Sequence, residues 1–221
     1  MKRNFFYLFG VLLIFMISTS LQAQISAPGS DGSDKTSYPS FPETDIIFIF
    51  CTNSDVDEIG RLQMNTDLTA TKTFLWEKYN NITADFEFYF SESTDAQSSE
   101  ISGLADGGYR ITITQGGTTV ISRAWVFNNW TVVDGSVTES DCDLFKLTGE
   151  FTTAELKYYD LSDNTELQVY KDVKVQWKDG DNIISTVLST TVYDPPTKDT
   201  EYTLRVYDKF ECDGTRKVTY V

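Results

Sequence analysis

Short runs of alternating apolar and polar residues, separated by clusters of turn-forming residues, fill the chain from Asp45 onwards. A period of two places successive side chains on opposite faces of a strand, whereas an amphipathic helix needs a period near 3.6. No segment after Asp45 sustains the helical period. The sequence therefore predicts an all-β protein with strands near residues 46–50, 61–64, 73–79, 86–90, 109–114, 121–126, 143–147, 155–160, 173–177, 202–208 and 216–221.

These strands fall into two series of similar length. Hairpin turns are expected at residues 115–118, which contain two glycines, and at residues 179–182. Each series spans about 85 to 90 residues, the size of an immunoglobulin-like sandwich. Each also has a tryptophan in a strand, Trp76 or Trp177, which we expect to fill the space between two sheets. We predict two tandem immunoglobulin-like β-sandwiches, residues 43–133 and 134–221.

The first 23 residues have the pattern of a secretory signal peptide. Lys2 and Arg3 precede an apolar run over 5–17, and small residues lead to Ala23, after which we expect cleavage. The alternative is a retained membrane anchor, but nothing downstream resembles a stop-transfer segment, so a transmembrane protein is not expected. The prediction is a secreted or cell-surface protein.

Residues 24–42 are rich in Gly, Ser, Pro and Asp and have few apolar side chains, which predicts a flexible linker. Residues 31–34, Asp-Gly-Ser-Asp, superficially resemble a calcium loop. They lack the continuing oxygen ligands and the terminal Glu of an EF-hand, so linker is the better interpretation.

The net charge excludes two classes of partner. The chain has 33 acidic and 18 basic residues, a net charge of −15. Loss of Lys2 and Arg3 with the signal peptide would make this −17. Nucleic acids and anionic lipid surfaces are bound through basic patches, so neither is an expected partner. An acidic surface suits solubility outside the cell, or the binding of divalent cations.

The chain contains no histidine. This removes the usual general base and the commonest zinc ligand, so we expect no enzyme and no catalytic residues. Two carboxylates could still hydrolyse a glycosidic bond, and Glu77, Asp85 and Glu87 lie near aromatic residues. However, Glu87 between Phe86 and Phe88 is typical of a solvent-facing position on a strand.

Three cysteines in an exported chain allow at most one intramolecular disulfide. Cys142 and Cys212 lie near the start and the end of the second predicted sandwich, so we expect them to pair. Cys51 then remains a small buried residue or an intermolecular link. The wide spacing and the absence of a CxxC motif argue against a thiolate metal site.

Calcium is the one cofactor that the sequence suggests. Asp55, Asp57 and Glu58, with Asn53, form one acidic loop, and residues 139, 141 and 143 form another. Hard cations need several oxygen ligands that converge from loops at one end of a sandwich. Acidic loops without a bound ion are more frequent, so both interpretations stay open.

Trp125, Phe127 and Trp130 crowd the predicted boundary between the sandwiches. Exposed, they would form a platform for sugar rings; buried, they would pack at the boundary and fix the relative orientation of the two halves. Residues 81–83 and 129–131 match the N-glycosylation pattern, which we interpret as coincidence.

Two passages resemble known modules. Residues 103–114, GLADGGYRITIT, are similar to the penultimate strand of PKD-like and other immunoglobulin-like modules of bacterial surface proteins. Residues 194–214, DPPTKDTEYTLRVYDKFECDG, resemble the ending of modules in secreted and gliding-associated Bacteroidetes proteins. The chain departs from that pattern at Glu211, where Gly is usual. The given sequence contains no recognisable C-terminal sorting domain, so we expect either a fragment of a longer protein or a different route to the surface.

The resemblance implies a spacer or interaction module without catalytic residues, with a surface protein or a glycan as its partner. The alternative is a carbohydrate-binding protein of a polysaccharide-utilisation system.

Overall fold

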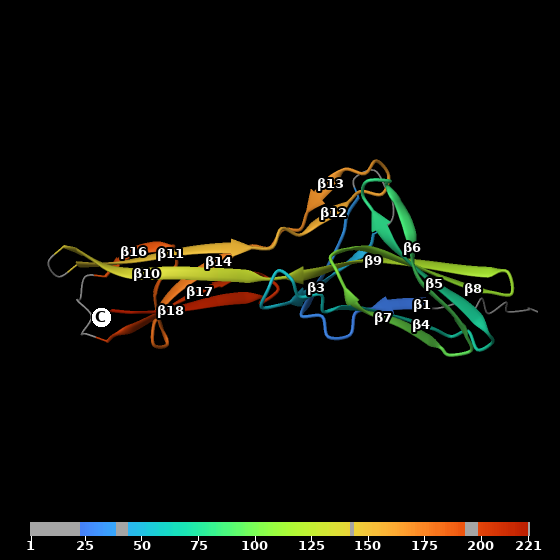
Figure 1. Ribbon diagram of the computed structural model, residues 1–221, viewed down its shortest axis with the longest axis horizontal. Helices are drawn as coiled ribbons and strands as arrows, with labels where there is room; N and C mark the ends of the chain where they lie inside the picture. Colours follow the sequence, from blue (N-terminus) through green and yellow to red (C-terminus); the bar gives the residue numbers. More distant parts are fainter. Residues whose placement is uncertain (1–22, 39–43, 142–143, 193–198, 221) are drawn as a thin grey trace, which may run out of the picture.

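A computed structural model describes residues 23–38, 44–141, 144–192 and 199–220. Every regular element in these ranges is a β-strand, so the predicted all-β class is confirmed. Two groups of strands lie end to end in an elongated molecule (Figure 1). The predicted signal peptide lies outside the described residues except for Ala23, and no helix among the described residues could span a membrane.

The first group is a sandwich of two sheets. One sheet has the order β1 (Ala23–Ser26), β4 (Gly60–Thr66) and β7 (Ser98–Leu104). The other has the order β2 (Gly32–Lys35), β3 (Ile46–Cys51), β9 (Thr118–Asn129), β8 (Gly107–Gln115), β5 (Lys72–Asn80) and β6 (Asp85–Thr94). Neighbouring strands are antiparallel except β3 and β9, which are parallel.

The core of the first sandwich has the marks of an immunoglobulin-like fold. Trp76, on the interior strand β5, is completely buried between the sheets, as predicted. Tyr109 is the third residue of β8, and its hydroxyl donates to the carbonyl of Ala105 at 2.8 Å, which is the tyrosine corner of such domains. Ile111 stands two residues later, where many immunoglobulin domains have a core cysteine. The order β9-β8-β5-β6 also matches the larger sheet of a variable-type domain.

The second group repeats this plan. One sheet has the order β10 (Thr131–Asp141), β11 (Leu144–Thr153) and β16 (Ser189–Val192). The other has the order β15 (Asn182–Ser185), β14 (Lys174–Asp179), β17 (Glu201–Tyr207) and β18 (Asp213–Thr219). Trp177 on β14 fills the core between them, with Leu147 on the facing sheet, as the sequence predicts.

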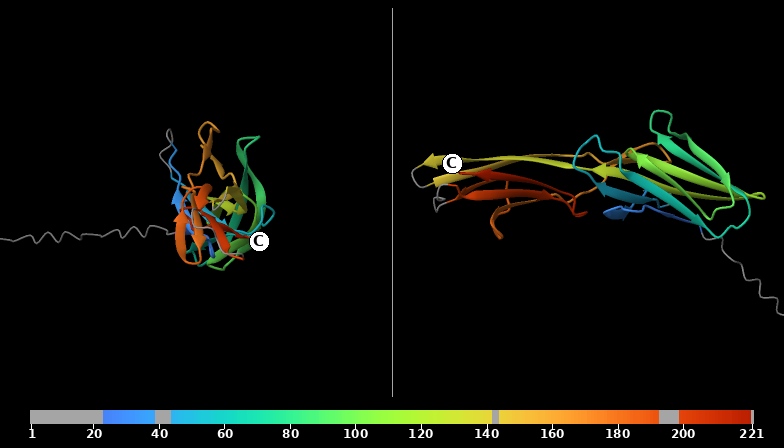
Figure 2. Two further views of the ribbon diagram at one scale, coloured as in Figure 1. Left: turned by 90° about the vertical axis from the view of Figure 1, so that its left-hand side faces the viewer. Right: turned by 60° about the horizontal axis from the view of Figure 1, so that its bottom comes forward.

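A separate hairpin extends from the second sandwich. Among the described strands, β12 (Lys157–Tyr159) and β13 (Glu166–Gln168) pair only with each other, and they lie in sequence between β11 and β14. The hairpin folds back over the first sandwich (Figure 1). Two further views confirm the end-to-end arrangement, with β10 continuing in the direction of β9 (Figure 2).

The expectation of a flexible linker over residues 24–42 is wrong for its described part. Strand β1 pairs with β4, and β2 pairs with β3. Strands pair through backbone hydrogen bonds, which need no apolar side chain, so the polar composition of this segment did not indicate that it forms strands. The few apolar residues present are used: Ile25 and Ala27 belong to the first core, and Tyr38 is 4% exposed.

Candidate functional site: the junction between the sandwiches

The polypeptide passes from one sandwich to the other without a flexible connection. Strand β9 ends at Asn129 and β10 begins at Thr131, so Trp130 alone separates them. Asn129 is completely buried. The carbonyl of Trp130 accepts from the amide of Ala154 at 3.1 Å. The crossover therefore lies inside the fold and not in a solvated loop.

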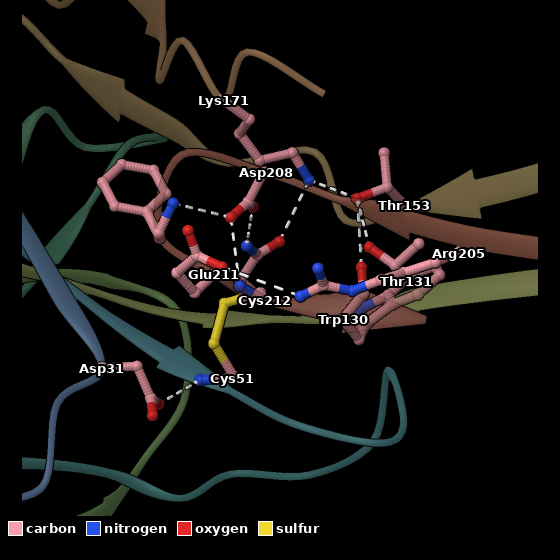
Figure 3. The surroundings of a disulfide bond; sticks show 12 residues. Asp31, Cys51, Trp130, Thr131, Thr153, Lys171, Arg205, Asp208, Glu211 and Cys212 are labelled. Carbon is pink, nitrogen blue, oxygen red and sulfur yellow. Dashed lines mark hydrogen bonds and ion pairs between the residues drawn. A yellow bond between two sulfur atoms is a disulfide. The ribbon is translucent and has the colours of Figure 1, made fainter. Parts of the chain in front are cut away.

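A disulfide ties the two sandwiches together. It joins Cys51, at the end of β3, to Cys212, in the turn between β17 and β18 (Figure 3). Cys51 lies opposite Asn129 because β3 runs parallel to β9, and this register brings the end of β3 to the junction. The Cα atoms of the two cysteines are 5.2 Å apart. The bond therefore restricts how far the sandwiches can separate at this point.

The predicted pairing of Cys142 with Cys212 is wrong, because Cys212 is bonded to Cys51. Cys142 itself lies outside the described residues. The strand before it, β10, starts at the junction and runs for 11 residues, which is about 35 Å of extended chain. A disulfide needs Cα atoms within about 7 Å. Sequence position near the start and end of one sandwich therefore did not imply proximity in space.

Asp208 organises the turn that carries Cys212. One carboxylate oxygen accepts from the amides of Phe210 at 2.8 Å and Cys212 at 3.2 Å, and the other accepts from the side-chain amide of Asn129 at 2.5 Å. Asp208 is 3% exposed. A buried carboxylate needs such donors to replace its lost hydration. The turn of the second sandwich is thereby fixed to the last residue of β9.

Lys171 continues this polar chain. Its ammonium donates to the side-chain oxygen of Asn129 at 3.0 Å and to the carbonyl of Ala154 at 2.6 Å. It also donates to the hydroxyl of Thr153 (Figure 3). Burial lowers the pKa of Lys171, and the nearby charge of Asp208 opposes that shift. The side-chain amide of Asn129 thus lies between the buried carboxylate of Asp208 and the half-buried ammonium of Lys171, and it is hydrogen-bonded to both.

The hairpin supplies an aromatic cover for the first sandwich. Tyr158 and Tyr159 on β12 lie with ring centroids 6.0 Å and 6.3 Å from that of Trp125. The hydroxyl of Tyr79 donates to the side chain of Asn164 at 2.8 Å, which ties the loop between β12 and β13 to β5. One apolar cluster therefore contains residues from both sandwiches and from the hairpin.

Trp125 is also held by hydrogen bonds within the first sandwich. Its indole N–H donates to the hydroxyl of Tyr38 at 2.9 Å, and that hydroxyl donates to Asp45 at 3.0 Å. Arg123 contacts the other oxygen of Asp45 at 3.1 Å. Burial raises the pKa of Tyr38 and of Asp45. The indole of Trp125 is therefore held by a hydrogen bond at its N–H and by ring contacts with Tyr158 and Tyr159.

The predicted aromatic group takes the packed alternative and not the exposed one. Trp125 and Phe127 are each 1% exposed, and Trp130 is half-buried against the same cluster. A sugar-stacking platform requires exposed ring faces, so Trp125 and Phe127 cannot provide one in this structure.

The two glycosylation patterns differ in accessibility. Asn129 is completely buried and hydrogen-bonded to Asp208, so its side chain cannot carry a glycan in the folded protein. Asn81 is exposed, but its amide donates to the hydroxyl of Tyr159 at 2.8 Å. Both asparagines contribute contacts at the junction.

The predicted calcium ligands lie in the loop between β3 and β4. Asp55 and Glu58 are exposed and Asp57 is half-buried. Within the described ranges, no three acidic or cysteine side chains converge as a cation site would require.

A small cleft opens beside the junction, with a volume of about 320 Å³. Its lining includes Lys78, Asp106, Lys157 and Tyr159. Lys157 is already engaged by Glu155 and Glu166, and the ammonium of Lys78 lies 5.5 Å from the ring centroid of Tyr109. The volume of this cleft is at the lower end of the range for small-molecule sites. Its lining carries both positive and negative side chains, so it favours neither anionic nor cationic ligands.

Several junction residues were not recognisable from the sequence. Asp208 and Lys171 each stand beside a residue of opposite charge, as exposed charged residues often do, and nothing in the local sequence distinguishes them as junction residues. The hairpin was predicted only as one strand of the second sandwich. The available signal was Tyr158-Tyr159, adjacent aromatics that an isolated surface hairpin would not need.

Searches with protein-family models and against curated proteins found no match. Solved structures with similar folds include three N-terminal domains of the outer capsid protein Hoc of bacteriophage RB49, with 12% identity, coverage of 91% of this chain and 59% of that one, and a TM-score of 0.35. Drosophila OTK extracellular domains 3–5 share 9% identity over 77% of this chain and 58% of that one, with a TM-score of 0.42.

The N-terminal four immunoglobulin domains of Dscam1 isoform 8.4 share 10% identity over 86% of this chain and 46% of that one, with a TM-score of 0.35. The chain thus spans about half of the length of these structures. These TM-scores are low, so the immunoglobulin-like assignment rests on the strand order of the sheets, on the buried Trp76 and on the tyrosine corner of Tyr109.

Proposed function

We propose that this chain is an exported, non-catalytic interaction or spacer module, secreted or held at the cell surface, that presents two immunoglobulin-like sandwiches in one fixed relative orientation. The sequence predicted these units as residues 43–133 and 134–221; the first sandwich also contains β1 and β2, which precede residue 43, and β10 of the second sandwich begins at Thr131. The partner class is a surface protein or a glycan.

The junction is the observation that carries this proposal. A protein whose only need was two independent binding units could join them by a solvated linker. Here the disulfide, the chain from Asp208 to Lys171 and the cover over Trp125 all oppose bending between the units. Fixed spacing is useful when contact surfaces at the two ends must be held apart.

A stable disulfide also supports export, because such bonds form and persist in oxidising compartments. The bond joins cysteines 161 positions apart, one at the end of β3 in the first sandwich and one in the turn between β17 and β18 of the second. A cytosolic location would leave this link reduced.

The export half of the proposal is tested by producing the full chain in a bacterial host and analysing the product by mass spectrometry after fractionation. We expect a chain that begins at Gln24, lies outside the cytoplasm and has one blocked pair of cysteines. An uncleaved cytoplasmic chain with three free thiols would contradict it.

A further inference from the structure

Strand β6 leaves a long backbone edge open to pairing. It is the last strand of the six-stranded sheet, and among the described strands it pairs with β5 alone (Figure 1). It has ten residues, whereas the opposite edge strand, β2, has four. An open edge presents unpaired amide and carbonyl groups that can accept another strand.

Three consecutive aromatic residues on β6 are exposed. Phe88 is 72% exposed, Tyr89 is 40% exposed and Phe90 is 39% exposed. A run of large apolar residues on a strand surface is unfavourable unless something covers or uses it.

A bulge distributes the aromatics over both faces of the edge. The register between β5 and β6 shifts between Trp76 and Glu77, so Phe90 lies opposite the inward-facing Trp76 and Phe88 lies opposite Glu77. Tyr89 is the additional residue, and its ring meets that of Tyr109 edge-on at 5.7 Å. A strand added beside β6 would therefore find aromatic contacts above and below it.

The charge on β6 indicates what kind of strand would fit. Its sequence, DFEFYFSEST, contains Asp85, Glu87 and Glu92 and no basic residue. Glu87 accepts from the side chains of Asn80 at 2.7 Å and Thr83 at 3.1 Å. Carboxylates beside exposed rings favour lysine and arginine, through ion pairs and cation–π contacts. A second copy of β6 would instead bring like charges together.

We propose that β6 is a docking edge for an extended basic segment of a partner protein, which adds to the six-stranded sheet as a further strand. Main-chain hydrogen bonds would hold the segment, and its alternate Lys or Arg side chains would lie on the face of Phe88. Glu87 points to the opposite face, so it would attract the segment through its charge and not by direct contact with those side chains. The inference rests on the proposed interaction role and names the surface through which one sandwich would act.

The test uses a fluorescein-labelled peptide, Lys-Val-Lys-Thr-Lys-Val-Lys-Thr, titrated with the mature protein while its anisotropy is followed. A peptide with Glu in place of Lys is the charge control. Two further isomers carry N-methyl groups on the odd or on the even residues. Successive backbone N–H groups of a strand point to opposite edges. One isomer therefore loses the N–H groups that would donate to β6, whereas the other loses only those that face away from it.

We expect saturable binding of the basic peptide and of one N-methyl isomer, and loss of binding for the other isomer and for the acidic peptide. Phe88→Ser should weaken binding about fivefold, the scale of one aromatic–cation contact. The matched control Val132→Ser, at a residue 55% exposed on β10, should leave it unchanged.

No saturable binding would overturn the proposal, as would equal binding of the two N-methyl isomers. A dimer that Phe88→Ser dissociates would also overturn it, in favour of a second copy as the occupant. None of these outcomes alters export or the rigidity of the junction, so failure here is distinguishable from failure of the proposed function.

Discussion

Removal of the disulfide between Cys51 and Cys212 should destabilise both sandwiches together. Its sequence separation of 161 residues encloses most of the chain. In the chain-entropy description, a loop of that length restricts the unfolded chain by about 5 kcal/mol at 25 °C, although measured effects are often smaller. For Cys51→Ser with Cys212→Ser we therefore expect the free energy of unfolding to fall by about 2 to 5 kcal/mol.

The assay is urea unfolding followed by tryptophan fluorescence, because Trp76 and Trp177 report on the two cores and Trp125 on the junction. Wild type with reductant should match the double variant, and Cys142→Ser should match the oxidised wild type. The reasoning is refuted if the double variant unfolds at the wild-type urea concentration. It is also refuted if Cys142→Ser lowers the midpoint as much as the double variant does.

Three further substitutions test other parts of the structure. Trp125→Ala should lower the free energy of unfolding by about 3 to 5 kcal/mol, because it empties the junction cluster; a loss below 1 kcal/mol in urea unfolding would count against that packing. Tyr109→Phe removes one hydrogen bond and should lower stability by about 1 kcal/mol; no measurable loss in the same assay would remove the tyrosine corner from the account. Asp106 has a pKa raised by burial, so its folded carboxyl holds its proton more tightly than the unfolded one. The contribution of this proton to the free energy of unfolding should be full below pH 3.8 and should be lost as the pH rises through the pKa of Asp106 in the folded protein. The free energy of unfolding of wild type minus that of Asp106→Asn should therefore fall as the pH rises over this range. A difference that rises with pH would show that burial does not raise the pKa of Asp106.

Local pattern predicted the all-β class and the strands that carry the two core tryptophans, but it predicted no strand at β7 or β10. The alternation around Ile111 and Ile113 gave a strand with one buried face, and Trp76 and Trp177 occupy the core positions expected of them. These features depend on neighbours a few residues apart, which a periodic sequence reveals directly.

The junction could not be predicted because its contacts join distant segments. Cys51 meets Cys212, and Asn129 meets Asp208 across 79 positions. Composition also misjudged residues 24–42, where two strands pair through the backbone despite few apolar side chains. Trp125 and Phe127 were recognised as a boundary group, but only the structure shows what covers them.

The central claim, a fixed orientation of the two sandwiches, is tested most directly by a distance distribution between them. Spin labels on non-cysteine amino acids at Thr118 and Asp181, exposed positions on different sandwiches, would be measured by pulsed electron paramagnetic resonance. We predict a single narrow distance in the oxidised protein, which broadens when Cys51→Ser and Cys212→Ser are combined with Trp125→Ala. A broad or multiple distribution in the intact oxidised protein would contradict the account.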